Sequence, residues 1–521
     1  MHKKLQIFSI KFIGITMAIT MMFLFLSCLI NTTYLNNFEW VELLKNNHFI
    51  SDLFFISFFI GIMFFIDSLS WNKRLNKILL ILLFIYTVLI SSFMIFSVNP
   101  VPQWDQFYII DGTTGFINGN FNYLLKGGYL NQHPHQLGLS AYYEILLRLT
   151  DVRLSYSIVQ LFNVLLICLI FLGFYFIVKE LTHTHHSKSL KLMLFLSFGM
   201  LPLIMYSAYC YGIIPGLFFA VWGGLYCVKF CKEETLKNGI LTIFFSSLAP
   251  VIKSNYYVFS IAVFIVLLIK TVSNRKYRYL VIGLISIMLS ISLNKGLIMF
   301  NELRSGLKIE NSMPMSPYIT MGMQESSRAN GWFNSYNWLL HMETDYDTEL
   351  TDKLAREQMK IEIQEFIDNP EYALEFYYDK IVSIWCEPTF GSFWANKNPI
   401  EENSHQEQNL FVNDFFNGKL NECLRFFMKI YQYILYLGTF LYAIFHIKEK
   451  DISKMVLLIY IFGGFLFHIL WEAKSSYVLC YYSCMLPLAA IGFETLFISI
   501  RKRIKPCVSR ARAIPNKKTF N

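Results

Sequence analysis

FIGITMAITMMFLFLSCLI, residues 12–30, is the stretch that decides the fold of this chain. It contains no charged side chain and is long enough to cross a hydrocarbon core of about 30 Å as a helix. Comparable apolar runs recur along the 521 residues, of which 55% are hydrophobic and only 16% are charged. A soluble domain carries about a quarter charged residues. The composition therefore predicts an all-α polytopic membrane protein.

About twelve apolar segments have the length of a transmembrane helix. They lie near residues 12–30, 51–69, 78–97, 155–178, 191–209, 211–230, 238–252, 255–271, 279–299, 428–447, 454–471 and 476–499. Cytoplasmic loops are enriched in lysine and arginine. With a cytoplasmic N-terminus, the basic clusters all fall on the inner side, at residues 73–77, 188–191, 232–237, 270–278, 448–454 and 501–518. We therefore expect both termini in the cytoplasm, and this topology explains the net charge of +9 without nucleic acid as a partner.

Two segments are too long to be simple connectors. We name them loop A (98–153) and loop B (301–425), and we expect both outside the membrane with amphipathic helices at Leu137–Leu149 and Thr348–Ile367. The predicted parts are 1–77, an N-terminal pair of spans; 78–300, a transmembrane core with loop A; 301–425, an extracytoplasmic cap; 426–499, the C-terminal spans; and 500–521, a basic cytoplasmic tail. Cys386 and Cys423 both lie in loop B, and a disulfide between them is left open.

Asp105 is the first candidate for chemistry. It follows the apolar run that ends near Phe96, and Tyr108, several glycines and the triplet His133-Pro134-His135 come after it in loop A. One interpretation is a carboxylate at a helix N-terminus, beside an interfacial tryptophan. The other is a general base at the membrane surface that accepts the proton of an incoming hydroxyl.

This pattern resembles the GT-C glycosyltransferases, specifically the polyprenyl-phosphate-sugar-dependent family 39. That family includes protein O-mannosyltransferases and bacterial lipid A aminoarabinose transferases. Its first outer loop opens with an Asp-Glu pair near a tyrosine and leads to a His-Pro-Pro-like element before a membrane-surface helix. Asp105, Tyr108 and His133-Pro134 match these features. Gln106 replaces the second acid, His135 replaces the second proline, and the loop follows the third apparent span rather than the first.

The resemblance covers roughly residues 78–300 and implies an enzyme. It implies transfer of one sugar from a polyprenyl phosphate to an envelope acceptor (polysaccharide, teichoic acid, lipid or protein), with inversion and Asp105 as the base. The Phe-, Ile-, Lys- and Asn-rich usage and the short loops favour a bacterial protein. Because loop A is expected outside, the reaction is expected on the outer face of the cytoplasmic membrane. No cofactor is required, and a divalent metal is not indicated by the pair His133 and His135 alone.

Lysines near the spans are the candidates for binding the donor phosphate. Lys253 lies between two apolar runs, and Lys474 lies with Tyr477 before the last span, where family members carry a basic and aromatic element. Snorkelling to the surface is the alternative for both lysines. The predicted substrate contacts are Tyr108, His133, His135, Trp332 and Glu387. Asp111 and Glu144 are reserve acids, with a solvated or structural role as the alternative.

Two other classes of function remain open. An envelope polysaccharide polymerase or ligase would also use lipid-linked saccharides, but it would depend on Arg and His in the large outer loop. A transporter or flippase would have inverted repeats and ionisable residues at mid-span. The sequence shows no repeat, and its notable charges lie at the ends of spans.

Overall fold

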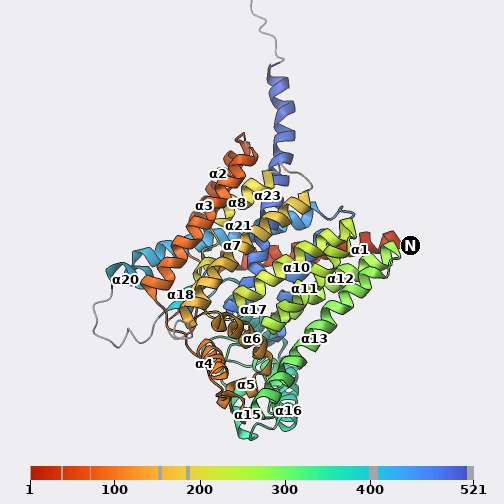
Figure 1. Cartoon of the computed structure of the whole chain (residues 1–521). Coiled ribbons are helices and arrows are strands. Elements are labelled where there is room, and N and C mark those ends of the chain that lie inside the picture. Colours follow the sequence, from red (N-terminus) through yellow and green to blue (C-terminus); the bar gives the residue numbers. More distant parts are fainter. Residues whose placement is uncertain are drawn as a thin grey trace, which may run out of the picture.

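The computed structural model describes residues 2–36, 39–70, 72–150, 155–182, 188–397 and 409–512. The described chain is all-α apart from one hairpin. Figure 1 shows long helices packed into a bundle, with several short helices of loops A and B, among them α4 (Asp105–Ile117) and α15 (Tyr336–Glu343), gathered at one end. The C-terminal part of α23 (Ser475–Arg512) extends from the opposite end. The predicted fold class is confirmed.

The remaining long helices form the bundle. They are α1 (His2–Ile30), α2 (Phe49–Ser68), α3 (Lys73–Ser92), α7 (Ser155–Thr182), α10 (Ile213–Glu233), α11 (Leu236–Ile252), α12 (Tyr257–Asn274), α13 (Arg278–Ser305), α21 (Lys419–Phe445) and α22 (Val456–Leu470). Helices α8 (Lys188–Ser197) and α9 (Leu201–Met205) make a pair that is bent by 53°. A short π-helix, η1 (Phe93–Val98), prolongs α3.

The predicted count of about twelve spans is not confirmed. Within the described residues, nine helices are long and apolar enough to cross a membrane, or ten if the bent pair counts as one span. The predicted segment 238–252 corresponds to α11, which has 17 residues and contains Pro250. The segment 428–447 lies in α21, whose apolar residues are interrupted by Arg425, Lys429, Gln432 and four tyrosines. Prediction and structure thus differ at helices that are too short or too polar to meet the criterion for a span.

Loops A and B consist of short helices that pack on each other. Loop A contains α4 (Asp105–Ile117), η2 (Asn122–Leu124), α5 (Tyr129–Gln132), η3 (Pro134–Gln136) and α6 (Leu137–Arg148). Loop B contains α14 (Ser316–Met321), α15 (Tyr336–Glu343), α16 (Thr348–Asp368), α17 (Pro370–Trp385), α18 (Ser392–Asn396) and α20 (Leu410–Asn417). Helices α6 and α16 confirm the two predicted amphipathic segments. The Met313 amide donates to the Gln132 carbonyl over 2.9 Å, which ties the two loops together.

The other short elements connect the bundle. The antiparallel hairpin β1 (Asn31–Leu35) and β2 (Val41–Lys45) pairs Asn31 with Lys45 and Leu35 with Val41. The 3₁₀ turns are η5 (Tyr206–Ala208), η6 (Ser254–Tyr256) and η7 (Ile452–Met455). Cys386 and Cys423 are both free thiols, so the disulfide left open by the sequence is not formed.

The predicted inner loops meet at one end of the bundle. Asp67, at the end of α2, pairs with Arg501 of α23 and lies 3.8 Å from the Lys188 ammonium. The Lys270 ammonium is 2.8 Å from the Asp451 carboxylate. These ion pairs join segments that the distribution of basic residues had assigned to one side. Of the predicted tail, residues 513–521 lie outside the described part of the chain.

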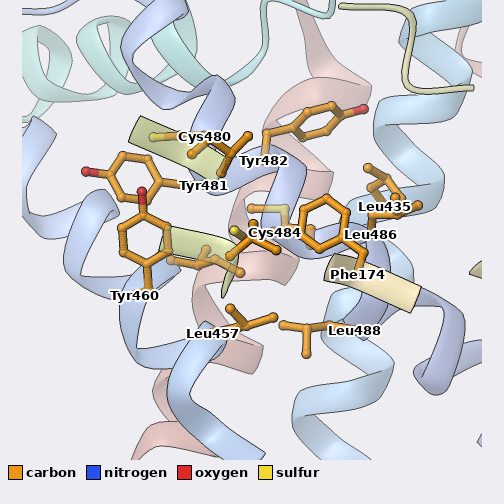
Figure 2. Close-up of a cluster of buried hydrophobic side chains, with 14 of the residues drawn as sticks. Phe174, Leu435, Leu457, Tyr460, Cys480, Tyr481, Tyr482, Cys484, Leu486 and Leu488 are labelled. Carbon is orange, nitrogen blue, oxygen red and sulfur yellow. The ribbon is translucent and has the colours of Figure 1, made fainter. Parts of the chain in front are cut away.

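The last helix runs through the centre of the molecule. Gly438 of α21 faces α23 so closely that an added Cβ atom would lie 2.6 Å from the Ala489 methyl group. Such small residues let two membrane helices approach each other. Figure 2 shows the buried side chains around α23, with Tyr460 beside Tyr481. Their ring centroids are 4.6 Å apart. The core therefore fixes the start of α23, where the site described next is located.

Candidate active site

Asp105 is the first residue of α4, which confirms the helix N-terminus considered for it. Trp104, just before it, has φ 50° and ψ −125°, a backbone conformation that is costly for a residue with a side chain. The neighbouring Gln106 side chain accepts a hydrogen bond of 2.8 Å from the Cys210 amide. Gln106 therefore anchors α4 on the segment before α10, and this fixes where the Asp105 carboxylate lies.

The other predicted loop A residues surround Asp105. The Tyr129 hydroxyl makes a hydrogen-bonding interaction with the Asp105 carboxylate, and the Tyr108 ring stacks on Tyr129 at 5.1 Å. The His133 ring lies 4.7 Å from Tyr129 and 5.8 Å from His135. Burial and nearby His341 lower the pKa of His133 to about 4, so this imidazole is neutral at pH 7.

His135 is exposed although protein surrounds it on several sides. Burial and His133 lower its pKa, while Asp105 acts in the opposite direction. Because the residue remains exposed, it faces open space beside Asp105. Two of the predicted substrate contacts, Tyr108 and His135, thus lie around the predicted base.

Lys253 approaches the same place from the end of α11. The bundle buries it to 8% exposure, and the ammonium lies 4.0 Å from the Tyr211 ring centroid and 5.3 Å from that of Tyr477. Burial lowers the pKa of Lys253 to about 8, while Asp105 opposes this effect. Among the described residues, no carboxylate forms an ion pair with it. Lys253 is therefore a buried cation held by aromatic faces and does not snorkel to the surface.

Glu472 is the residue that sequence reasoning missed. It lies in the short connection between α22 and α23 and is only 7% exposed. Burial raises the pKa of Glu472 to about 7, and Lys474 acts in the opposite direction. No hydrogen bond or ion pair joins its carboxyl group to another residue in the described ranges. An acid flanked by Trp471 and Lys474 before a span was visible in the sequence, but its burial without a partner was not.

Electrostatic interactions connect these groups into one site. Asp105 acts on the ionisation of Tyr211, Lys253, Tyr318, Glu472 and Tyr477. The Tyr211 hydroxyl accepts a 2.7 Å hydrogen bond from the Gln136 amide. The Tyr318 hydroxyl lies 3.3 Å from His133 Nδ1, and its ring stacks on Trp471 at 5.4 Å. We call this group the acid–lysine cluster: Asp105, Tyr129, His133, His135, Tyr211, Lys253, Tyr318, Glu472 and Tyr477.

Lys474 lies at the edge of the acid–lysine cluster, and its ammonium already has an ion-pair partner. Its ammonium pairs with Glu39 and lies 4.4 Å from the Trp394 ring centroid. Glu39 is 5% exposed and pairs with Arg328 as well. Of the two predicted phosphate-binding lysines, Lys253 is therefore the one that forms no ion pair within the described residues.

Trp332 and Glu387 hold loop B together. Trp332 is 1% exposed, and its indole donates a 2.8 Å hydrogen bond to the Ser383 hydroxyl. The Ala473 amide donates to the Gly331 carbonyl over 2.8 Å, so the chain at Trp332 lies next to the chain that follows Glu472. The buried Glu387 carboxylate accepts from the Gly391 amide over 2.6 Å and so closes its own turn. The structure brings neither residue into the acid–lysine cluster.

The reserve acids have other surroundings. Arg304 donates two hydrogen bonds to the Glu144 carboxylate, at 2.8 and 2.9 Å, and Arg148 donates another at 2.7 Å. Asp111 is exposed and accepts a 2.9 Å hydrogen bond from the Tyr123 hydroxyl. Glu144 is thus held in an ion-pair network, and Asp111 is a solvated carboxylate. Across the described residues, no group of three or more His, Cys, Asp and Glu is placed to hold a metal ion.

Neither a known protein family nor a curated protein matches this chain. Its structure is similar to solved structures of the oligosaccharyltransferase of Archaeoglobus fulgidus. AglB in complex with an inhibitory peptide and a dolichol-phosphate is 12% identical, with a TM-score of 0.41 over 86% of this chain and 53% of that one. The apo form is 11% identical, with a TM-score of 0.45 over 87% and 54%. This chain spans about half the length of those proteins, and so distant a likeness assigns neither a fold family nor an activity.

Proposed function

We propose that this protein is an integral-membrane glycosyltransferase of the GT-C type. It moves a single sugar from a polyprenyl-phosphate donor to a cell-envelope acceptor on the outer face of a bacterial cytoplasmic membrane, with both termini in the cytoplasm. Asp105 is the general base, and Lys253 binds the donor phosphate.

One observation supports this proposal above the others. The acid–lysine cluster contains a carboxylate and a buried ammonium that do not form an ion pair with each other. Keeping a buried charge without a counter-ion costs free energy, so such residues usually mark a bound ion or a reaction site. An anionic phosphate beside Lys253 would supply the missing charge. Asp105 would then stand beside the reacting carbon.

The chemistry follows from these positions. The acceptor hydroxyl gives its proton to the Asp105 carboxylate as its oxygen bonds to the anomeric carbon. The bond from that carbon to the phosphate oxygen breaks, and its electron pair leaves with the polyprenyl phosphate. Attack opposite the leaving group inverts the anomeric configuration. The Lys253 ammonium stabilises the charge that develops on the departing phosphate, which is electrostatic catalysis.

A transfer assay in membranes tests the proposal. Vesicles that contain the full-length protein are given radiolabelled undecaprenyl-phosphate hexoses and pentoses and, in parallel, pyrophosphate-linked oligosaccharides, with envelope extract as the acceptor. The proposal predicts transfer from at least one monophosphate donor and none from the pyrophosphate series. Transfer from pyrophosphate-linked oligosaccharides alone would instead identify a polymerase or ligase.

A further inference from the structure

Glu472 is the starting point of the inference, because no protein group among the described residues accounts for its burial. A buried carboxyl group normally accepts hydrogen bonds or pairs with a cation, since leaving it without a partner costs free energy. Lys474 is adjacent in sequence but pairs with Glu39. Within the described chain, Glu472 has neither a hydrogen-bond donor nor a salt-bridge partner, although it is 7% exposed.

The position of Glu472 indicates what could partner it. Trp471, the residue before Glu472, stacks on Tyr318, whose hydroxyl lies 3.3 Å from His133 Nδ1. On the other side of Glu472 in the chain, the Tyr477 ring lies 5.3 Å from the Lys253 ammonium. In the proposed reaction, the donor sugar must lie between the phosphate at Lys253 and the acceptor hydroxyl at Asp105. Glu472 is therefore beside the space that the sugar ring would occupy.

The side chains between the two acids are aromatic. Tyr318 and Tyr477 each interact electrostatically with both Asp105 and Glu472. The Tyr318 ring is held by its stacking on Trp471 at an interplanar angle of 10°. A sugar ring presents C–H groups on its faces and hydroxyl donors at its edge. Rigid aromatic rings beside an acceptor carboxyl group match both features.

We infer that Glu472 binds hydroxyl groups of the donor sugar and makes the site selective for the sugar-bearing lipid over the bare lipid phosphate. This inference rests on the proposed function and adds a specificity-determining residue to it. A neutral, hydroxyl-rich sugar is the favoured ligand, because the Lys253 ammonium has no ion-pair partner among the described residues and would repel an additional cation.

Binding measurements on the purified full-length protein in lipid nanodiscs test this role. The probes are undecaprenyl phosphate without a sugar and the undecaprenyl-phosphate hexose that the wild type binds most tightly. A group that hydrogen-bonds only the sugar should change the second dissociation constant and leave the first unchanged. For Glu472→Ala we expect Kd to rise about 10- to 100-fold for the sugar-bearing lipid, the usual loss for a hydrogen bond to an ionisable group.

A matched control and a second measurement exclude a general structural effect. Glu375→Ala removes an exposed acid of α17 and should change neither affinity. Monodeoxy versions of the same donor are then tested on wild type and on Glu472→Ala. At the hydroxyl that Glu472 binds, the wild type should lose affinity about 10-fold or more, and the variant should lose little further. This test on wild type does not depend on whether Glu472→Ala folds.

The outcomes separate the two proposals. If the wild type binds neither lipid, the proposed function fails and the role of Glu472 fails with it. If the wild type prefers the sugar-bearing lipid but Glu472→Ala binds it equally well, only the role of Glu472 is overturned. Equal weakening for both lipids, or a wild type indifferent to every deoxy position, would also overturn it.

Discussion

The two ends of the helix bundle differ in whether certain buried charged residues have ion-pair partners. At the end where the predicted inner loops meet, the fully buried Asp67 pairs with Arg501 and Lys188, and Lys270 pairs with Asp451. At the end formed by loops A and B, Lys253 and Glu472 are almost as buried. Neither has an ion-pair partner in the described part of the chain.

This difference separates charges that hold the fold from charges that are available for a ligand. Removing one partner of a buried pair destabilises a protein because the other charge is left alone. A cation that is already alone in the folded protein is instead stabilised when an anion binds. Substitutions of a paired buried charge should therefore change stability, and substitutions of an unpaired one should change binding and turnover.

Asp105→Asn should have the largest effect. The amide keeps the shape of the side chain but cannot accept the proton of the acceptor hydroxyl. We expect turnover to fall about 10²- to 10⁴-fold, the usual contribution of a positioned general base. Donor affinity should stay within about threefold of wild type. Single-turnover transfer assays measure both quantities, and unchanged turnover would remove Asp105 as the base.

Lys253→Ala should come next. Loss of the ammonium removes the charge that binds the phosphate, so the Kd for undecaprenyl phosphate should rise about 10- to 100-fold. The acceptor KM should change less than the donor affinity, because in the proposed reaction Lys253 contacts the phosphate and not the acceptor. Lys474→Ala is the matched comparison: its ammonium pairs with Glu39, so we expect a smaller loss of donor affinity. Equal losses for the two variants would contradict the distinction between paired and unpaired lysines.

The pH dependence of donor binding tests the same lysine without changing its shape. Burial lowers the pKa of Lys253 to about 8, and the phosphate binds the protonated form. Affinity should therefore be full below that pKa and fall as the pH rises through it, by about tenfold between pH 7.5 and 9. Lys253→Arg stays charged over this range, because the arginine pKa is above about 12. Its pH profile should be flat, and a wild-type slope in that variant would exclude Lys253 as the titrating group.

Asp67→Asn should affect stability instead. The substitution leaves Arg501 and Lys188 without their shared carboxylate, which is 0% exposed. Since both cations are partly open to solvent, we expect a loss of about 1–3 kcal/mol in the free energy of unfolding. Thermal unfolding in detergent measures this loss. Turnover per folded molecule should equal that of wild type, and a selective loss of turnover would show that this end also serves the reaction.

Asp111→Asn should have the smallest effect. Asp111 is exposed, and within the described chain it accepts a hydrogen bond from the Tyr123 hydroxyl. Surface substitutions usually change stability by less than about 0.5 kcal/mol. Turnover within about twofold of wild type is expected in the transfer assay. A loss comparable to that of Asp105→Asn would transfer the role of base to Asp111.

Most of the spans, and two residues of the candidate site, could be predicted from the sequence because their signals are local. A long apolar run can be recognised as a span from the sequence alone, and α6 and α16 can be predicted as helices from their apolar periodicity. Asp105 and Lys253 are noticeable because a charge beside an apolar run is rare. Asp105 and Lys253 lie close together because the connections that carry them are at the same end of the bundle.

The remaining features depend on contacts between distant segments. The pairing of Lys474 with Glu39 joins the last loop to the N-terminal hairpin, and no spacing rule predicts it. Trp332 has an aromatic ring of the kind that stacks on sugars, but packing places its indole against Ser383. Glu472 was missed for the same reason, since an acid in a short loop gives no sign that folding will bury it without a partner.

A structure of the protein with an undecaprenyl-phosphate sugar bound would show whether Lys253 holds the donor phosphate. We expect a phosphate oxygen within about 4 Å of the Lys253 ammonium, the distance of an ion pair. The anomeric carbon should lie between that phosphate and the Asp105 carboxylate. A donor phosphate bound at the Asp67 end, or bound beside loops A and B but away from Lys253, would contradict the account.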